Sequence, residues 1–289
     1  MDGMTLSTTR YAATPRPVLH LDGPKLAEAL QTVVTKSDGV GGIEFLVRGV
    51  QFKAEVLADV FGSEKLDKLD IDTLLSAAAF MSPVRRRLGP WLEETGVDGM
   101  DTVKTAIKTL IAEAAQSGGV DVAVRRFCDA FPSGRNFRWV RDLAVEILHA
   151  VMPEQVPLMN RWVWDVTANT GVIRELWHDP NIDHMTLDIP DNHETFLVLR
   201  EELSQYLSDN GVFRDVLAYV DILCAQIYGN YICAQGGSYL RTDFSATEDP
   251  LLYTRRMLGL DGIDPETGRT RAKGVSGRPI ILDIDETTD

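Results

Sequence analysis

The chain has 289 residues, of which 44% are hydrophobic, 8% aromatic and 25% charged. This balance is typical of a globular protein and excludes disordered, collagen-like and fibrous classes. Asp and Glu outnumber Lys and Arg by 43 to 29, which gives a formal net charge of −14. Because a general nucleic-acid binder carries the opposite sign, that class is excluded for the chain as a whole.

Cysteine usage and hydropathy indicate the compartment. The cysteines Cys128, Cys224 and Cys233 are widely spaced and odd in number, which fits neither a disulfide framework nor a four-thiolate metal site, so we expect a reducing compartment. The longest apolar runs, such as 74–81, are shorter than the ~20 residues of a membrane-spanning helix, and no basic-then-apolar leader opens the sequence. We therefore predict a cytoplasmic protein without a membrane span.

Helical periodicity dominates the chain. Asp22 can cap a first helix with Pro24 in its first turn, and Asp191 or Asn192 can cap a later one. Residues 43–52 fit a strand or a helix, and we favour helix there. The one strand-like piece lies at 279–284. The expected helices are 22–38, 54–61, 71–81, 83–95, 101–116, 120–131, 135–152, 158–168, 172–177, 192–207, 213–234 and 246–260.

This pattern predicts an all-α, multi-helix globular protein, since strands are too scarce for alternating β and α units. Residues 1–21 lack helical periodicity and are expected to form a loose N-terminal arm with an extended piece at 18–21. Residues 22–245 form the expected helical domain. Residues 246–289 add a C-terminal helix and an acidic tail, and Gly236-Gly237 is expected to end the long helix before it.

Charge is distributed unevenly. Residues 1–165 carry a net charge of −3 and residues 166–289 a net charge of −11. The nearly neutral part contains two groups of arginines that could form a local anion-binding face, or that could be a solvated helix face over apolar surface. The first group is Arg85, Arg86 and Arg87, and the second is Arg125, Arg126, Arg135, Arg138 and Arg141.

A family resemblance rests on residues 103–165. Predicted helices at 103–115 and 120–131 precede the turn Pro132-Ser133-Gly134-Arg135, and a further helix follows at 135–150. Residues 156–163 then match a pattern of apolar residue, Pro, two apolar residues, an Asp position, two variable residues and Val. In this order the region, within a glycosylase-like part at 70–168, resembles the helix-hairpin-helix DNA glycosylase superfamily.

The resemblance implies that the backbone N–H groups of the turn hold a DNA phosphate and that the target base is flipped out of the stack. The family's catalytic Asp falls on Asn160, whose amide carries no negative charge to stabilise the sugar cation. Asp165 is nearby, but on a helix it would point about 140° away from Asn160. The turn also has one glycine where the family has two. The nucleic-acid-binding residues implied are Gly134, Arg135, Arg138, Arg141 and Trp162.

A histidine-rich segment follows. His178, Asp183, His184 and His193 supply imidazole and carboxylate groups, the ligand types of transition-metal sites. Their spacing matches neither a helical pair nor a His-Glu-x-x-His motif, and an exposed loop explains them equally. A transition metal is thus the one cofactor that the sequence suggests.

Three functions follow as hypotheses. The first is a glycosylase-like binding module for nucleic acid that has lost catalysis at Asn160. The second is an acidic helical adaptor whose C-terminal part attracts a basic partner protein. The third is a metal-dependent enzyme that uses His178, His184 and His193. The first two favour a protein that is not an enzyme.

Overall fold

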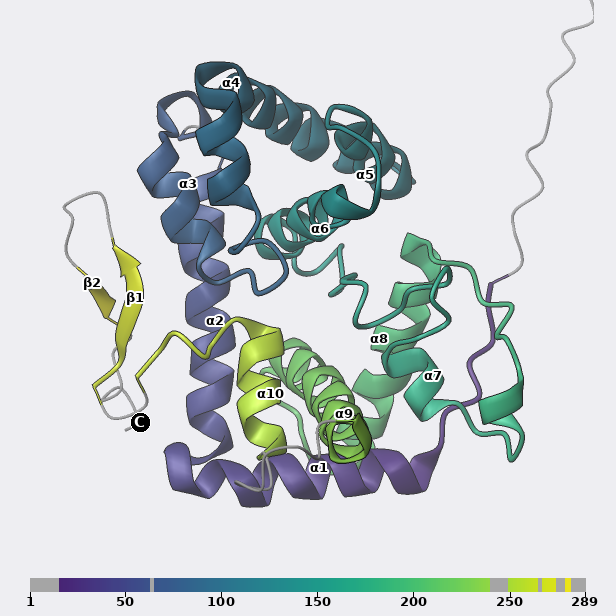
Figure 1. Cartoon of the computed structure of the whole chain (residues 1–289). Helices are drawn as coiled ribbons and strands as arrows, with labels where there is room; N and C mark the ends of the chain where they lie inside the picture. The colour runs from purple at the N-terminus through teal and green to yellow at the C-terminus, as the bar shows by residue number, and fades with distance from the viewer. Residues whose placement is uncertain (1–15, 63–64, 240–248, 265–266, 274–278, 282–289) are drawn as a thin grey trace, which may run out of the picture.

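The structure is a computed structural model that describes residues 16–62, 65–239, 249–264, 267–273 and 279–281, with the side chains of 236–239, 271–273 and 279–281 left out. Within these residues it has ten α-helices and one two-stranded hairpin, which confirms the all-α prediction (Figure 1). The helices are α1 Gly23–Ser37, α2 Gly42–Phe61, α3 Ile71–Ala78, α4 Leu88–Ala114, α5 Val120–Asp129, α6 Trp139–Val151, α7 Val172–Leu176, α8 His193–Asp209, α9 Val216–Tyr239 and α10 Pro250–Leu258. The strands are β1 Arg269–Lys273 and β2 Pro279–Ile281, which pair antiparallel.

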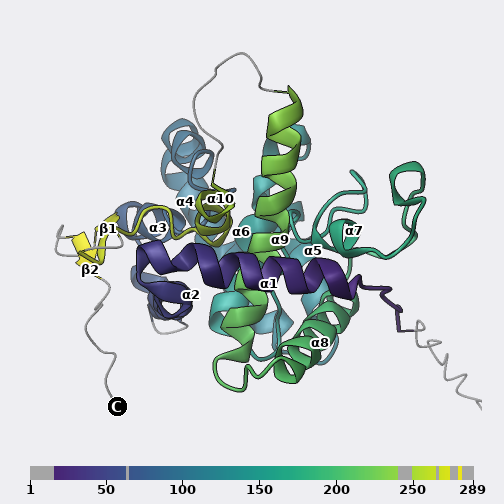
Figure 2. The ribbon, with the colours of Figure 1, turned by 90° about the horizontal axis from the view of Figure 1, so that it is seen from below.

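The helix α9 lies at the centre of one half of the molecule. It packs against α1, α7, α8 and α10, while α6 packs against α2 and α5 in the other half. Seen from below, α1 crosses α9, and the C-terminal part of α9 extends beyond it (Figure 2). The helix α2 contacts both α6 and α9 and so joins the two halves.

Capping side chains set where several helices begin. The Asp22 carboxylate accepts a hydrogen bond from the Lys25 N–H at 3.0 Å, and the Asn192 amide oxygen accepts one from the Thr195 N–H at 3.0 Å. Each bond satisfies an N–H that the first helical turn leaves unpaired. Both caps confirm the sequence prediction, with Asn192 rather than Asp191 at the start of α8.

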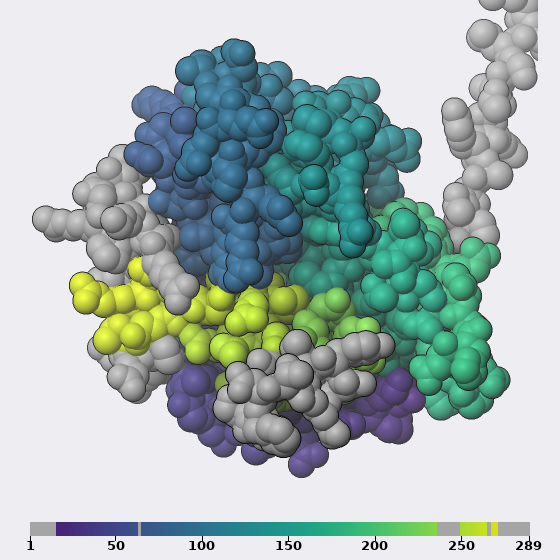
Figure 3. Space-filling view, viewed as in Figure 1, coloured from purple at the N-terminus to yellow at the C-terminus, as the bar shows by residue number. Residues whose placement is uncertain are grey.

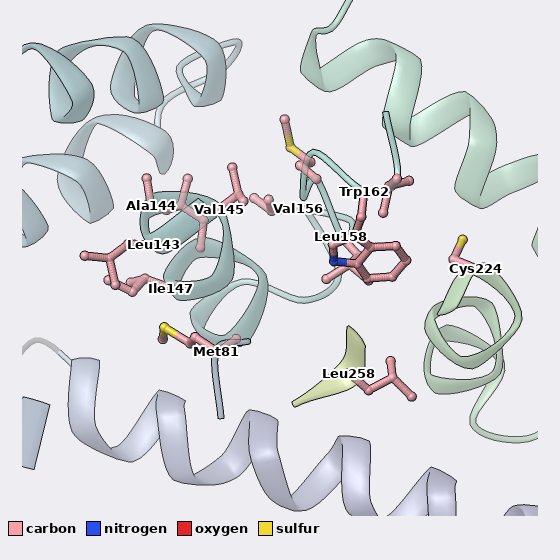
Figure 4. Close-up of a cluster of buried hydrophobic side chains, with 14 of the residues drawn as sticks. Met81, Leu143, Ala144, Val145, Ile147, Val156, Leu158, Trp162, Cys224 and Leu258 are labelled. Carbon is pink, nitrogen blue, oxygen red and sulfur yellow. The ribbon is translucent and has the colours of Figure 1, made fainter. Parts of the chain in front are cut away.

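The apolar core continues through both halves. Leu143, Ile147 and Leu158 are buried around α6, and Trp162 lies between them and the helix that carries Cys224 (Figure 4). Burial of each such side chain stabilises the fold by roughly 1.5 to 3 kcal/mol before cavity effects. The core therefore includes the segment that resembles the glycosylase pattern.

The helix α9 also has the length and composition of a membrane span over Val216–Gln235, and no other helix in the described residues does. In that window 56% of the residues are buried inside the fold. Its contacts with α1, α8 and α10 are those of a core helix. Length and apolarity alone therefore do not distinguish a span from a core helix here.

The structure confirms the helix favoured at 43–52, which is part of α2, and corrects two other elements. The helices predicted at 83–95 and 101–116 correspond to the two parts of α4, which Gly96 interrupts with a non-helical φ of 59°. The helix predicted at 158–168 is wrong, because the Asn160 carbonyl closes a turn and Asp165 pairs with Thr170 in an isolated bridge. The helix α9 does not end at Gly236-Gly237 but continues to Tyr239.

Part of the predicted N-terminal arm is fixed to the rest of the chain. Leu21 forms an isolated bridge with Trp177, and the His178 N–H donates to the His20 carbonyl at 2.8 Å. The expected extended piece at 18–21 is therefore held by backbone bonds. Residues 1–15 and the acidic residues after 281 lie outside the described residues.

Candidate functional site

The predicted hairpin turn lies between α5 and α6. Gly134 has a φ of 121°, a conformation that side chains with a Cβ rarely adopt, and a short 3-10 helix, Arg135–Phe137, follows it. Gly134 and Arg135 are exposed, and Trp139, the first residue of α6, is buried. The exposed turn thus carries one glycine and one guanidinium that forms no ion pair or hydrogen bond with a described residue.

The other two predicted phosphate-binding arginines are held by carboxylates. Arg138 forms an ion pair with Asp165 at 2.6 Å. Arg141 forms one with Asp191 at 2.5 Å and donates to the Met159 carbonyl at 2.8 Å. Because these guanidiniums already have partners, the positive charge offered to a phosphate at the turn comes mainly from Arg135.

Asn160 lies in the protein interior. Its side-chain Nδ2 donates to Glu146 Oε1 at 3.1 Å, whereas its Oδ1 is buried without a hydrogen-bond partner. Glu146 Oε2 forms an ion pair with Lys53 Nζ at 2.7 Å, and Lys53 also donates to the Leu258 carbonyl at 3.0 Å. Asn160 is therefore part of a buried polar network that links α2, α6 and α10.

A second buried pair lies beside this network. His149 Nε2 is 2.8 Å from Asp221 Oδ2, and its Nδ1 is 2.8 Å from the Val156 carbonyl. Burial alone lowers the pKa of His149, but the Asp221 carboxylate and the two hydrogen bonds outweigh it and raise that pKa above its ordinary value. Lys53, Glu146, His149 and Asp221 enclose a cavity of only about 30 Å³, which leaves no room for a base or sugar.

The remaining residues of the glycosylase-like segment also have structural contacts. Asp165 accepts a hydrogen bond from the Ala168 N–H at 3.0 Å in addition to its ion pair with Arg138. Trp162 is 8% exposed and lies 6.0 Å from the Tyr228 ring, which in turn lies 5.6 Å from the Tyr231 ring. These three rings connect the segment to α9.

The four predicted metal ligands are not brought together. His178 Nδ1 lies 3.1 Å from the Asp22 carboxylate, His193 Nε2 lies 2.9 Å from the Gln155 carbonyl, and His184 is exposed in the loop after α7. Throughout the part of the chain that the structure describes, no three His, Cys, Asp or Glu side chains form a group that could hold a metal ion. A metal-dependent activity stays a prediction without a site.

The thiols are poor nucleophiles where they stand. Burial raises the pKa of the Cys128 thiol to about 11, and burial with the nearby Asp221 raises that of Cys224 as well. At neutral pH both are therefore protonated, and only a thiolate attacks effectively.

A cleft of about 680 Å³ lies between α1, α7 and α9. We call it the α1–α9 cleft. Its volume lies within the range of ligand-binding pockets, and Tyr231 of α9 connects it to the rings of Tyr228 and Trp162. Its lining residues are Lys25, Glu28, Ala29, Thr32, Thr170, Arg174, Glu175, Asp183, Ile227, Asn230, Tyr231, Ala234, Gln235 and Pro250.

Both cations of the α1–α9 cleft are bound to backbone carbonyls. Lys25 Nζ donates to the Glu175 carbonyl at 2.7 Å. Arg174 donates to the Met185 carbonyl at 2.9 Å and to the Ile182 carbonyl at 2.6 Å. These bonds hold the loop after α7 in place and direct the guanidinium toward the protein.

The carboxylates of the cleft are free by comparison. Glu28 and Asp183 are exposed, and neither forms an ion pair or hydrogen bond with any described residue. Burial raises the pKa of Glu175, although Lys25 and Arg174 oppose that rise. The cleft therefore offers unpaired negative charge beside an aromatic ring.

Sequence reasoning missed both the buried network and the α1–α9 cleft. Glu146 gave one usable signal, since a lone carboxylate among apolar residues on the buried face of α6 needs a partner. The cleft gave no local signal, because its walls come from segments far apart in the sequence. Comparisons with protein-family models, with curated proteins and with solved structures found no match for this chain.

Proposed function

We propose that this protein is a non-catalytic binding module that holds a basic segment of another protein in the α1–α9 cleft. The observation that carries this proposal is the state of the charges there. Lys25 and Arg174 are bound to carbonyls, while Glu28 and Asp183 have no cationic partner among the described residues. A Lys or Arg side chain of a partner would supply the missing charge.

The walls of the cleft suit a peptide segment better than a small ion. Tyr231 and Ile227 give it an apolar side, and Thr32, Asn230 and Gln235 add polar groups that can bond to a peptide backbone. A cation close to the face of Tyr231 would gain about 0.5 to 1 kcal/mol. The net charge of −11 over residues 166–289 would attract such a partner.

A fluorescent basic peptide tests the proposal. The probe is a labelled dodecapeptide of alternating lysine and leucine, and its binding is followed by fluorescence anisotropy. We expect the double variant Glu28→Gln/Asp183→Asn to bind it about fivefold more weakly, since each rim charge contributes up to about 1 kcal/mol. The matched control is Glu55→Gln/Asp129→Asn, which removes two exposed carboxylates elsewhere and should change affinity less than about twofold. Equal affinities for both double variants would disprove the assignment.

Nucleic-acid binding by the glycosylase-like region is a second candidate. One observation favours it, namely the exposed turn at Gly134 with the unpaired guanidinium of Arg135 beside it. If a phosphate binds there, affinity for a short DNA duplex should fall with salt, and Arg135→Ala should reduce the slope of that dependence by about 1. Binding that is absent at low salt, or a slope that Arg135→Ala leaves unchanged, would reject this candidate.

A further inference from the structure

A second cleft lies on the other side of α10, between the segments 75–89 and 252–262. Figure 3 shows the surfaces of these two parts of the chain, blue and yellow, side by side. This cleft has a volume of about 610 Å³ and is separate from the α1–α9 cleft, to which α10 contributes Pro250. We call it the arginine cleft. Its lining residues are Leu75, Ala79, Phe80, Arg85, Arg86, Gly89, Leu252, Arg256, Gly259, Asp261 and Gly262.

Backbone packing makes the floor of the arginine cleft rigid. Gly259 ends α10 with a φ of 78°, and a Cβ at this position would overlap the Phe80 carbonyl oxygen. On the other wall, Val84 is fully buried and anchors the turn that carries Arg85 and Arg86. The two walls are thus joined by a close approach that only glycine permits.

An ion pair joins the two walls of the cleft. Arg85 donates through both terminal nitrogens to Asp261, each at 2.7 Å, and both side chains are mostly buried. Such a bidentate pair fixes the position of the guanidinium. Asp261 is the one carboxylate among the residues that line the cleft, and Arg85 neutralises its charge.

Two further guanidiniums line the same cleft, and the charge of one of them, Arg256, helps to lower the pKa of Asp261. Arg86 is exposed, and Arg256 lies over the Tyr253 ring at 5.3 Å. Neither forms an ion pair or a hydrogen bond within the described residues. The three arginines and the one aspartate leave a local charge of +2, in a chain whose formal net charge is −14.

Apolar side chains line both walls beside the arginines. Leu75 and Phe80 come from α3 and the turn after it, and Leu252 comes from α10. A ligand with a flat apolar body could contact these side chains while its charged group reaches the arginines. Ligand pockets commonly combine an apolar lining with a few placed polar groups.

We propose that the arginine cleft binds a small organic phosphate monoester, with the phosphate between Arg86 and Arg256 and the apolar body against Leu75, Phe80 and Leu252. A phosphate monoester carries a charge of about −1.5 to −2 at neutral pH, which matches the local charge of the cleft. Guanidinium groups match phosphate oxygens in geometry as well as in charge. A carboxylate, with a single negative charge, would leave half of the cleft's charge uncompensated.

Calorimetric titration with 1-naphthyl phosphate tests this assignment. We expect saturable binding to the full chain, and about tenfold weaker binding in each of the variants Arg86→Gln and Arg256→Gln, as for loss of one charge-assisted contact. The matched control is Arg87→Gln, an exposed neighbour that does not line the cleft, which should leave the affinity unchanged. Thermal melting of each variant shows that it is folded.

Two further titrations make the outcome decisive. Inorganic phosphate alone and 1-naphthoate should each bind at least about tenfold more weakly than 1-naphthyl phosphate, because each lacks the apolar body or the second charge. Equal binding of inorganic phosphate would indicate a simple anion site, and equal binding of 1-naphthoate a carboxylate site. Either result, or wild-type affinity in both cleft variants, would overturn the proposal.

Discussion

The buried network around Asn160 and the α1–α9 cleft both contain carboxylates, but the surroundings of these carboxylates differ. In the interior, Glu146 is paired with Lys53 and Asp221 with His149. In the cleft, Glu28 and Asp183 have no partner among the described residues. An unpaired charge is very costly away from water and nearly free beside it. Asn160 therefore lies among paired charges in the interior, whereas Glu28 and Asp183 lie at the surface.

Removing one partner of the interior pair tests this comparison most strongly. We expect Lys53→Met to lower the free energy of unfolding by about 3 to 5 kcal/mol, because Glu146 would be left buried without a cation. Denaturant unfolding followed by circular dichroism measures the loss. The double variant Lys53→Met/Glu146→Leu should recover part of it, since it removes the stranded charge but leaves the buried Asn160 Nδ2 without its acceptor. A single variant as stable as the wild type would show that the pair is not needed.

Gly171 lies between Thr170, which lines the α1–α9 cleft, and the start of α7. Its replacement gives the next largest effect. It has a φ of 124°, and a Cβ there would lie 2.6 Å from the Val163 carbonyl oxygen. We expect Gly171→Ala to lower the free energy of unfolding by about 2 to 4 kcal/mol through strain and overlap. Gly118→Ala, at a φ of 69° with open space around the Cβ, is the control and should cost about 1 kcal/mol. Equal losses of stability in the two variants would show that the overlap of the new Cβ with Val163 does not contribute to the loss.

The pair of His149 and Asp221 predicts a pH dependence of stability. Because the pKa of His149 is raised above 6.5, its contribution is complete below about pH 6.5 and is lost as the pH rises through the raised value. We expect a decline of at most about 1.4 kcal/mol per pH unit in urea unfolding measured from pH 6 to 9. In Asp221→Asn, the largest cause that raises the pKa is lost and burial is opposed only by the Val156 bond and the Glu146 charge, so the decline should shrink or disappear. An unchanged profile in that variant would contradict the assignment to this pair.

The ion pair of Arg138 and Asp165 predicts the smallest effect. The Arg138 side chain is 41% exposed, so Arg138→Gln should lower the free energy of unfolding by less than about 1 kcal/mol. Arg161→Gln is the contrasting variant, because it strands Asp142, whose side chain is 1% exposed, and should cost about 2 to 4 kcal/mol. Thermal and denaturant unfolding of both variants measure the difference. A larger loss of stability in Arg138→Gln than in Arg161→Gln would contradict the expectation that a buried ion pair contributes more than an exposed one.

The sequence predicted the helical class and most of the helices because their apolar faces and caps are local signals. It failed where tertiary bonds override periodicity. Residues 158–168 have the apolar content of a helix, but the Asn160 carbonyl and the bridge from Asp165 to Thr170 turn the chain instead. At Gly96 the local signal was correct, since its φ of 59° and ψ of −134° interrupt α4 between the two predicted helices.

The candidate sites were predicted less well than the fold. The Arg85 to Arg87 cluster was visible in the sequence as a basic group, but its pairing with Asp261 depends on a contact across 176 positions of the chain. Similarly, Lys53 gave no hint of its partner Glu146. Local patterns identify the type of a charged residue, and only the fold determines whether that charge is already used.

The bond from Lys53 to the Leu258 carbonyl spans 205 positions and closes one of the longest loops in the molecule. A ribosome synthesises Lys53 long before α10 exists, so the nascent chain carries this ammonium group without its final surroundings. Closure of such a distant contact is slow compared with local helix formation. This buried network is therefore completed only after α10 has been synthesised, late in the production of the chain.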